Sequence, residues 1–203
     1  MDEKDKITLA EKYRLLIQAR NFHYENFNKW MTYFYVAISA LFVGYCTVVA
    51  SQKSLTAYQN IIPLLGFIVS LLWYWSSKGY YYWNINFITL VNHYEKSLLK
   101  FDENERIYFV FANKKKQNNY LSPISGANIS TSKVAILLAF IITAFWGFVF
   151  FNNIINYYFC NCLPYIVMEI VFSIFSIIIL SDTIPNRYLF SKNDHFPDLK
   201  IEE

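Results

Sequence analysis

The sequence is poor in helix-breaking residues and in charge. Its 203 residues include only 5 glycines and 5 prolines, and charged residues make up 16% of the chain against 55% hydrophobic residues. Soluble domains carry about 25% charged residues, so this composition lies outside their usual range. No proline stands between Pro63 and Pro123, which predicts a long uninterrupted helix in that interval.

Signatures of catalysis and of metal binding are missing as well. The chain has no His-Glu-x-x-His motif, no Gly-x-Ser-x-Gly motif and no glycine-rich phosphate loop. Its three histidines, His23, His93 and His195, are scattered. We therefore expect a protein that is not an enzyme and that holds no cofactor and no metal.

Four stretches are uncharged or nearly so: residues 30–50, 61–77, 134–151 and 163–180. Each has about the 17–25 residues that a helix needs to cross a bilayer. They are apolar on all sides, whereas helices around a soluble core would be amphipathic. The sequence predicts an all-α polytopic membrane protein with four transmembrane helices in two hairpins.

Basic residues predict the orientation. Six precede residue 30, eight lie within 78–133 and three follow residue 181, whereas the remaining one, Lys53, lies between the first two stretches. Because Lys and Arg concentrate on the cytoplasmic side, both termini and the central segment are expected in the cytoplasm. The net charge of +3 then reflects topology, and we expect no direct binding of nucleic acid. The abundance of Asn, Lys, Ile, Tyr and Phe favours a bacterial inner membrane.

The chain divides accordingly into five parts. We expect a cytosolic amphipathic leader helix over 1–29, a first hairpin over 30–77, and a cytosolic helix with an irregular linker over 78–133. A second hairpin over 134–181 and a cytosolic tail over 182–203 complete the chain. The second helix is expected to run from 61 to 100, about 58 Å, and so to extend into the cytosol. Small residues four apart, at Ala40 and Gly44 and at Gly66 and Ser70, predict a tight first hairpin.

Arg20 and His23 are one candidate site, because residues three apart share a helix face. They are either a partner-binding point or an RNase-type pair, or else an arginine near headgroups beside an ordinary histidine. The spacing is shorter than the Arg-x4–6-His motif of HEPN ribonucleases, which argues against cleavage.

Glu169 is the other candidate site, as the one charged side chain within the four stretches. A carboxylate at that depth is costly in lipid and is expected to face protein or water. It is either a proton or cation site or part of a ring of carboxylates that lines an oligomeric pore, or else a residue hydrated near the interface or hydrogen bonded to another helix.

Cys160 and Cys162 lie in the second outer loop. They are candidate periplasmic thiols, paired with each other, paired between subunits, or free.

The segment Arg20-Asn-Phe-His-Tyr-Glu-Asn-Phe27, with the run from Trp75 through Tyr82-Trp83 to Glu95, carries a family likeness. It resembles the small four-span membrane accessory proteins of type VI-B CRISPR loci and related bacterial anti-phage membrane effectors. The resemblance implies modulation of a partner RNA-guided, RNA-targeting nuclease.

Two functions follow as expectations. The first is a non-enzymatic, homo-oligomeric accessory or effector of antiviral defence, which modulates a soluble nuclease or perturbs the membrane. The alternative is a small ion- or proton-coupled transporter or channel that uses Glu169.

Overall fold

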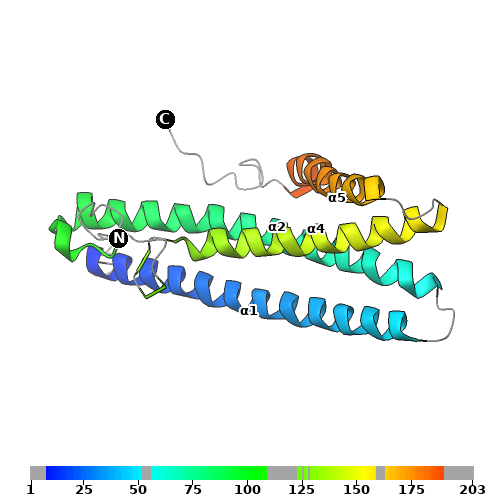
Figure 1. The fold of residues 1–203 in the computed structure, drawn as a ribbon. Coiled ribbons are helices and arrows are strands. Elements are labelled where there is room, and N and C mark those ends of the chain that lie inside the picture. The colour runs from blue at the N-terminus through cyan, green and yellow to red at the C-terminus, as the bar shows by residue number, and fades with distance from the viewer. Residues whose placement is uncertain are drawn as a thin grey trace. The chain divides into compact units, whose positions relative to one another are not determined.

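A computed structural model of the chain describes residues 8–51, 56–108, 123–124, 126–127, 129–158 and 163–189. All of its regular elements are helical. The long helices are α1 (Leu9–Ala50), α2 (Thr56–His93), α4 (Thr131–Tyr158) and α5 (Leu163–Ile184) (Figure 1). The short ones are the π-helices η2 (Tyr94–Leu98) and η4 (Pro185–Leu189) and the 3₁₀ turn η3 (Glu103–Glu105). Each long helix is long and apolar enough to cross a membrane, which confirms the predicted fold class.

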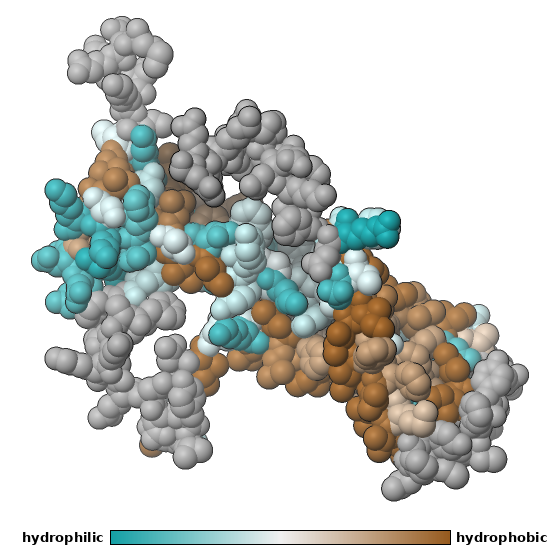
Figure 2. All heavy atoms as spheres, turned by 90° about the horizontal axis from the view of Figure 1, so that it is seen from above, coloured by the Kyte–Doolittle hydropathy of each residue, from teal (hydrophilic) through white to brown (hydrophobic). Residues whose placement is uncertain are grey.

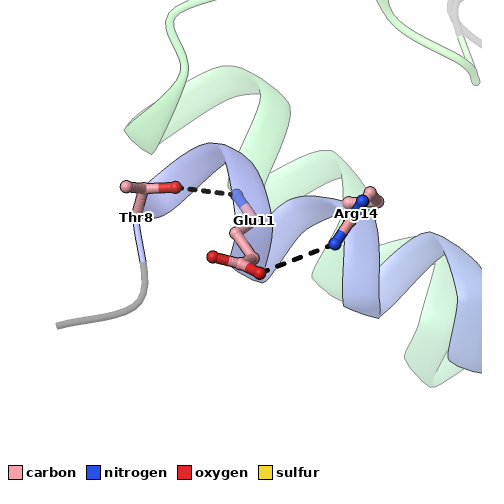
Figure 3. Close-up of polar contacts among 3 residues, drawn as sticks. All are labelled: Thr8, Glu11 and Arg14. Atoms are coloured by element: carbon pink, nitrogen blue, oxygen red, sulfur yellow. Dashed lines mark hydrogen bonds and ion pairs between the residues drawn. The ribbon is translucent and has the colours of Figure 1, made fainter. Parts of the chain in front are cut away.

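Helix α1 begins with a polar cap and continues without interruption. The backbone N–H of Glu11 donates to Oγ1 of Thr8 over 3.3 Å, and Arg14 pairs with the Glu11 carboxylate at 3.5 Å (Figure 3). Threonine caps helices well because its oxygen accepts an otherwise unsatisfied N–H. The leader helix predicted over 1–29 and the first span predicted from residue 30 are thus one helix of 42 residues.

The second helix ends differently from its prediction. A single helix was expected up to Lys100, but α2 is regular only to His93 and then widens into η2. Lys100 has φ of 55°, a left-handed conformation that side chains other than glycine rarely adopt and that ends the helix. Ser130 caps the start of α4, because its Oγ accepts the N–H of Lys133 over 3.4 Å.

The chain forms two compact units. The first comprises Met1–Val36 and Ser76–Leu137, and the second comprises Ala37–Trp75 and Leu138–Glu203. In the space-filling view, hydrophilic side chains gather around the beginning of α1 and the end of α2, whereas hydrophobic side chains cover the face that carries α5 (Figure 2).

The second unit has an apolar core drawn from three helices. Phe67 and Leu71 of α2 pack with Trp146 of α4 and Ile177 of α5. Two polar bonds join the same helices: Trp75 Nε1 donates to Oγ of Ser181 over 2.8 Å, and Ser173 Oγ donates to the Ala144 carbonyl over 2.9 Å.

Close helix packing occurs at Gly66 and not at Gly44. A Cβ on Gly66 would lie 2.6 Å from Cε3 of Trp146, so the indole of α4 occupies the space that a side chain would fill. A Cβ on Gly44 would meet nothing within 4 Å. The small-residue pattern in α2 thus accommodates α4, and the tight approach predicted at Gly44 was wrong.

Few of the apolar side chains in these helices are covered by the chain itself. In the most apolar window of each span, the buried share is 6% in α1, 39% in α2, 22% in α4 and 17% in the helical stretch Ile166–Ile184. Contiguous apolar surface of this extent needs lipid or another protein surface to cover it.

Replacing Gly66 by alanine tests the packing of the second unit. We expect Gly66→Ala to lower the free energy of unfolding by about 1–3 kcal/mol, the usual cost of overpacking a core. The matched change Gly44→Ala adds the same methyl group in open space and should not lower stability, because alanine favours a helix more than glycine does. Thermal unfolding in detergent measures both variants, and equal melting temperatures would contradict the assignment.

Candidate functional site

Glu95 is the most unusual residue of the first unit, because its carboxylate is fully buried. Tyr13 of α1 donates its hydroxyl hydrogen to Oε1 of Glu95 over 2.6 Å. The backbone N–H of Ile107 donates to the same oxygen over 3.2 Å. Glu95 therefore joins the start of α1, the end of α2 and the segment that follows η3.

The π-helix carries Glu95 in its first turn. π-Turns are rare and insert an extra residue into a helix, which changes the direction of the side chains they carry. The remaining oxygen of the carboxylate, Oε2, has no hydrogen-bond partner in the described part of the chain. A buried acceptor without a partner lowers the stability of the fold. The two hydrogen bonds to Oε1 are therefore needed to offset part of that cost.

The Tyr13 hydroxyl stays neutral beside this carboxylate. Tyr13 precedes the apolar stretch of α1 by 17 residues and so lies outside the membrane-spanning part. Burial, followed by the hydrogen bond to Glu95, raises the pKa of Tyr13 well above its usual value. The phenol thus keeps the hydrogen that it donates.

Arg20 of α1 contacts Tyr108, which directly follows Ile107. Its Nη1 donates to the Tyr108 hydroxyl over 3.3 Å, and its guanidinium lies 5.8 Å from the centre of the Tyr108 ring. Burial raises the pKa of Tyr108, and the hydrogen bond from Arg20 partly offsets that rise. Arg20 also donates to the side-chain oxygen of Asn21.

His23 packs against aromatic rings of α2. Its imidazole stacks on Tyr80 with ring centroids 4.7 Å apart and lies 5.2 Å from the Phe87 ring. Phe27, one turn further along α1, stacks on Tyr80 at 3.6 Å. Burial lowers the pKa of His23, which precedes the apolar stretch, and so favours its neutral form.

Arg20 and His23 therefore have different partners. Arg20 bonds to Tyr108, whereas His23 is part of the stack with Tyr80. Both side chains join α1 to other parts of the first unit. Their predicted roles in partner binding and in cleavage stay predictions.

Glu169 is buried within the second unit, with 1% of its surface exposed. Asn152 of α4 donates from Nδ2 to Oε2 of Glu169 over 2.9 Å. The neighbouring Asn153 donates to the backbone carbonyl of Gln59 over 2.6 Å. Glu169 thus faces protein, as expected for a carboxylate within a span, and two adjacent asparagines of α4 contact α5 and α2.

The predicted thiol site falls outside the described residues, because both Cys160 and Cys162 do. Cys46 is a free, exposed cysteine in α1. Across the described ranges no group of three or more His, Cys, Asp or Glu side chains is placed to hold a metal ion.

Sequence reasoning missed Tyr13, Asn152 and the burial of Glu95. For Glu95 the signal in the sequence was an acidic residue near the end of an amphipathic helix, and most such residues are solvated. Asn152 and Asn153 interrupt an apolar helix, and this is a usable sign of polar contacts within a span.

These features define a polytopic, all-helical membrane protein. Its first two long helices extend beyond their apolar stretches and form a charged module, in which the hydrogen bonds of Glu95 hold the helices together. The model of the octameric membrane protein family (8xMP) matches residues 10–155, and the chain belongs to this family of oligomeric membrane proteins. No curated protein and no solved structure matches the chain.

Removing the Tyr13 hydroxyl tests the tie at Glu95. We expect Tyr13→Phe to destabilise the first unit by about 1.5–3 kcal/mol, the value of a hydrogen bond to a charged group. Hydrogen exchange at the Ile107 amide should accelerate by the corresponding factor.

Tyr82→Phe is the matched control, because Tyr82 has 65% of its surface exposed. It should leave exchange at Ile107 at the wild-type rate. Unchanged exchange in Tyr13→Phe would show that the hydrogen bond from Tyr13 to Glu95 does not hold the segment around Ile107 in place.

Proposed function

We propose that the protein is a non-enzymatic accessory of bacterial antiviral defence, assembled as an octamer in the inner membrane. It modulates a soluble, RNA-targeting CRISPR nuclease or perturbs the membrane when the defence system is triggered. The observation that carries the proposal is the module of the first unit that the hydrogen bonds of Glu95 hold together. There α1 and α2 extend past their apolar stretches and Glu95 holds them together.

The distribution of charge supports the placement of this module in the cytoplasm. Positively charged residues cluster before the first apolar stretch and between the second and third ones, where the first unit lies. A soluble partner in the cytoplasm would meet helices that Glu95, Tyr13 and the Tyr80 stack hold in a fixed arrangement. A preformed surface of this kind binds at a lower entropic cost than a disordered one.

Membership of an oligomeric membrane family supports the assembly. The large exposed apolar surface of the spans is suited both to lipid and to further copies of the chain. An octamer would present eight first units to one partner, and several linked contacts raise the overall affinity.

The experiment compares cells that express the protein alone with cells that also express its neighbouring operon genes. We expect cleavage of target RNA by the nuclease to change when the protein is present, with membrane potential recorded in the same cells. Depolarisation only after triggering would favour the membrane-perturbing form of the proposal. Unchanged cleavage and unchanged potential in all cells would contradict it.

His23 separates an accessory from a ribonuclease. His23→Phe keeps an aromatic ring against Tyr80 but removes the nitrogens that cleavage would need. We expect this variant to retain modulation, and His23→Ala to weaken it by loosening the stack. A cleaving enzyme would instead lose all activity in both variants, as measured by RNA cleavage with purified protein.

The second candidate function is a small ion- or proton-coupled transporter or channel. The observation that favours it is the burial of Glu169 against Asn152 inside the second unit. A buried ionisable residue in a span is a common feature of proton and ion pathways.

Glu169→Gln distinguishes the two functions. Gln keeps an oxygen for Asn152 but cannot ionise, so a coupled transporter should lose ion flux while an accessory retains nuclease modulation. Glu103→Gln makes the same change at an exposed site and is the control. Flux is measured in proteoliposomes and modulation in cells.

A further inference from the structure

Helix α1 carries a row of exposed apolar side chains before its apolar stretch begins. This α1 row consists of Leu15, Ala19 and Phe22, with 47% of Leu15 and 64% of Phe22 exposed. Spacings of four and seven residues place the three side chains on one face of the helix. The contact with α2 uses another face, on which Phe27 stacks on Tyr80. The α1 row is therefore not part of that contact.

Helix α2 carries a second such row after its apolar stretch has ended. This α2 row consists of Trp83 and Leu90, which are seven residues apart and 50% and 44% exposed. The next residue after each, Asn84 and Val91, is buried, with 6% and 0% exposed. Because successive residues of a helix differ in direction by about 100°, α2 has a buried side and an exposed apolar side at the same level.

Lipid does not reach either row. Counted along the helix axis at about 1.5 Å per residue, Leu15 lies about 22 Å before the apolar stretch of α1, and Leu90 lies about 20 Å after that of α2. The headgroup layer adds only about 5–8 Å to each side of the hydrocarbon core. Apolar side chains exposed at this distance from lipid mark a surface that binds protein.

Membership of the octameric family indicates which protein covers the rows, namely further copies of this chain. The matched residues, 10–155, include both rows. Copies that insert into a membrane in one orientation are related by rotation about an axis normal to the membrane. A closed octamer of such copies is a ring, in which two different faces of each copy meet.

The two rows lie at matching levels, as contact around such a ring requires. Within one copy, Phe27 faces Tyr80 and Tyr13 bonds to Glu95, which fixes the register of α1 against α2.

In that register Phe22 is level with residues 85–86 and Leu15 with residues 92–93. Trp83 and Leu90 each lie two to three residues from these levels, or about 4 Å, less than one helical turn. Because both rows repeat after seven residues, Phe22 and Leu15 can meet Trp83 and Leu90 at the same time.

We propose that the α1 row of each copy packs against the α2 row of the next copy around the octamer. Phe22 packs beside Trp83, and Leu15 packs beside Leu90. Interface cores are rich in aromatic residues and poor in charge, as these rows are. The inference rests on the octameric assembly of the proposed function, and it holds whether that assembly modulates a nuclease or perturbs the membrane.

Cross-linking between copies tests this interface without changing either row. Gln18 of α1 and Asn86 of α2 are exposed polar residues that stand between the members of their rows. The double variant Gln18→Cys with Asn86→Cys is made in the full-length protein with its three native cysteines replaced by serine. After treatment with a short bis-maleimide in detergent, denaturing electrophoresis should show a ladder of linked species beyond two copies and up to eight, because each copy is linked to a different neighbour on either side.

The control is Gln18→Cys with Asn92→Cys. Asn92 is exposed and lies within three residues of the level of Gln18, but it stands nine positions after Trp83 and so on the opposite face of α2. This pair should give no ladder. The same ladder in both variants, or none with Asn86→Cys, would overturn the proposal. Products that stop at two copies would also overturn it, because they would show a two-fold contact.

Native mass spectrometry of the wild-type protein counts the copies independently. Eight copies without the ladder would reject this interface and leave the assembly standing. Single copies would reject both the interface and the octamer of the proposed function.

Discussion

The first unit depends on one buried carboxylate. Moving the charge of Glu95 out of water is costly, and the fold compensates with the Tyr13 hydroxyl and the Ile107 amide. Removal of either donor leaves a buried charge with less support, so the beginning of α1, the end of α2 and the following segment hold together or separate together. A hydrophobic contact in the same place would tolerate sliding, whereas these directional bonds specify one register of α1 against α2.

The two units achieve order by different means. In the second unit, apolar residues from α2, α4 and α5 pack around Trp146, and polar groups such as Glu169 bond to a neighbouring helix. In the first unit, rings stack on Tyr80 and polar side chains carry the long-range contacts. Lipid offers no hydrogen bonds, so the polar groups of membrane helices must bond within the protein. Where water reaches a helix, it competes for the same hydrogen bonds.

The four spans and the all-helical class were predictable because each depends on local composition and length. The Ser130 cap of α4 was predictable for the same reason, since a cap needs only its own turn. The bond between Tyr13 and Glu95 joins residues 82 positions apart, and no local pattern indicates which tyrosine meets which carboxylate. Gly44 and Gly66 look alike in sequence, yet only Gly66 faces a large neighbouring ring.

The tryptophans give each unit its own optical reporter. Trp30 belongs to the first unit and is 59% exposed, whereas Trp73 and Trp146 belong to the second and are fully buried. Exposed indoles emit at longer wavelengths and are open to quenchers, and enclosed ones are not. Fluorescence of the native chain, without any attached dye, can therefore follow what happens at the membrane surface separately from what happens among the packed helices.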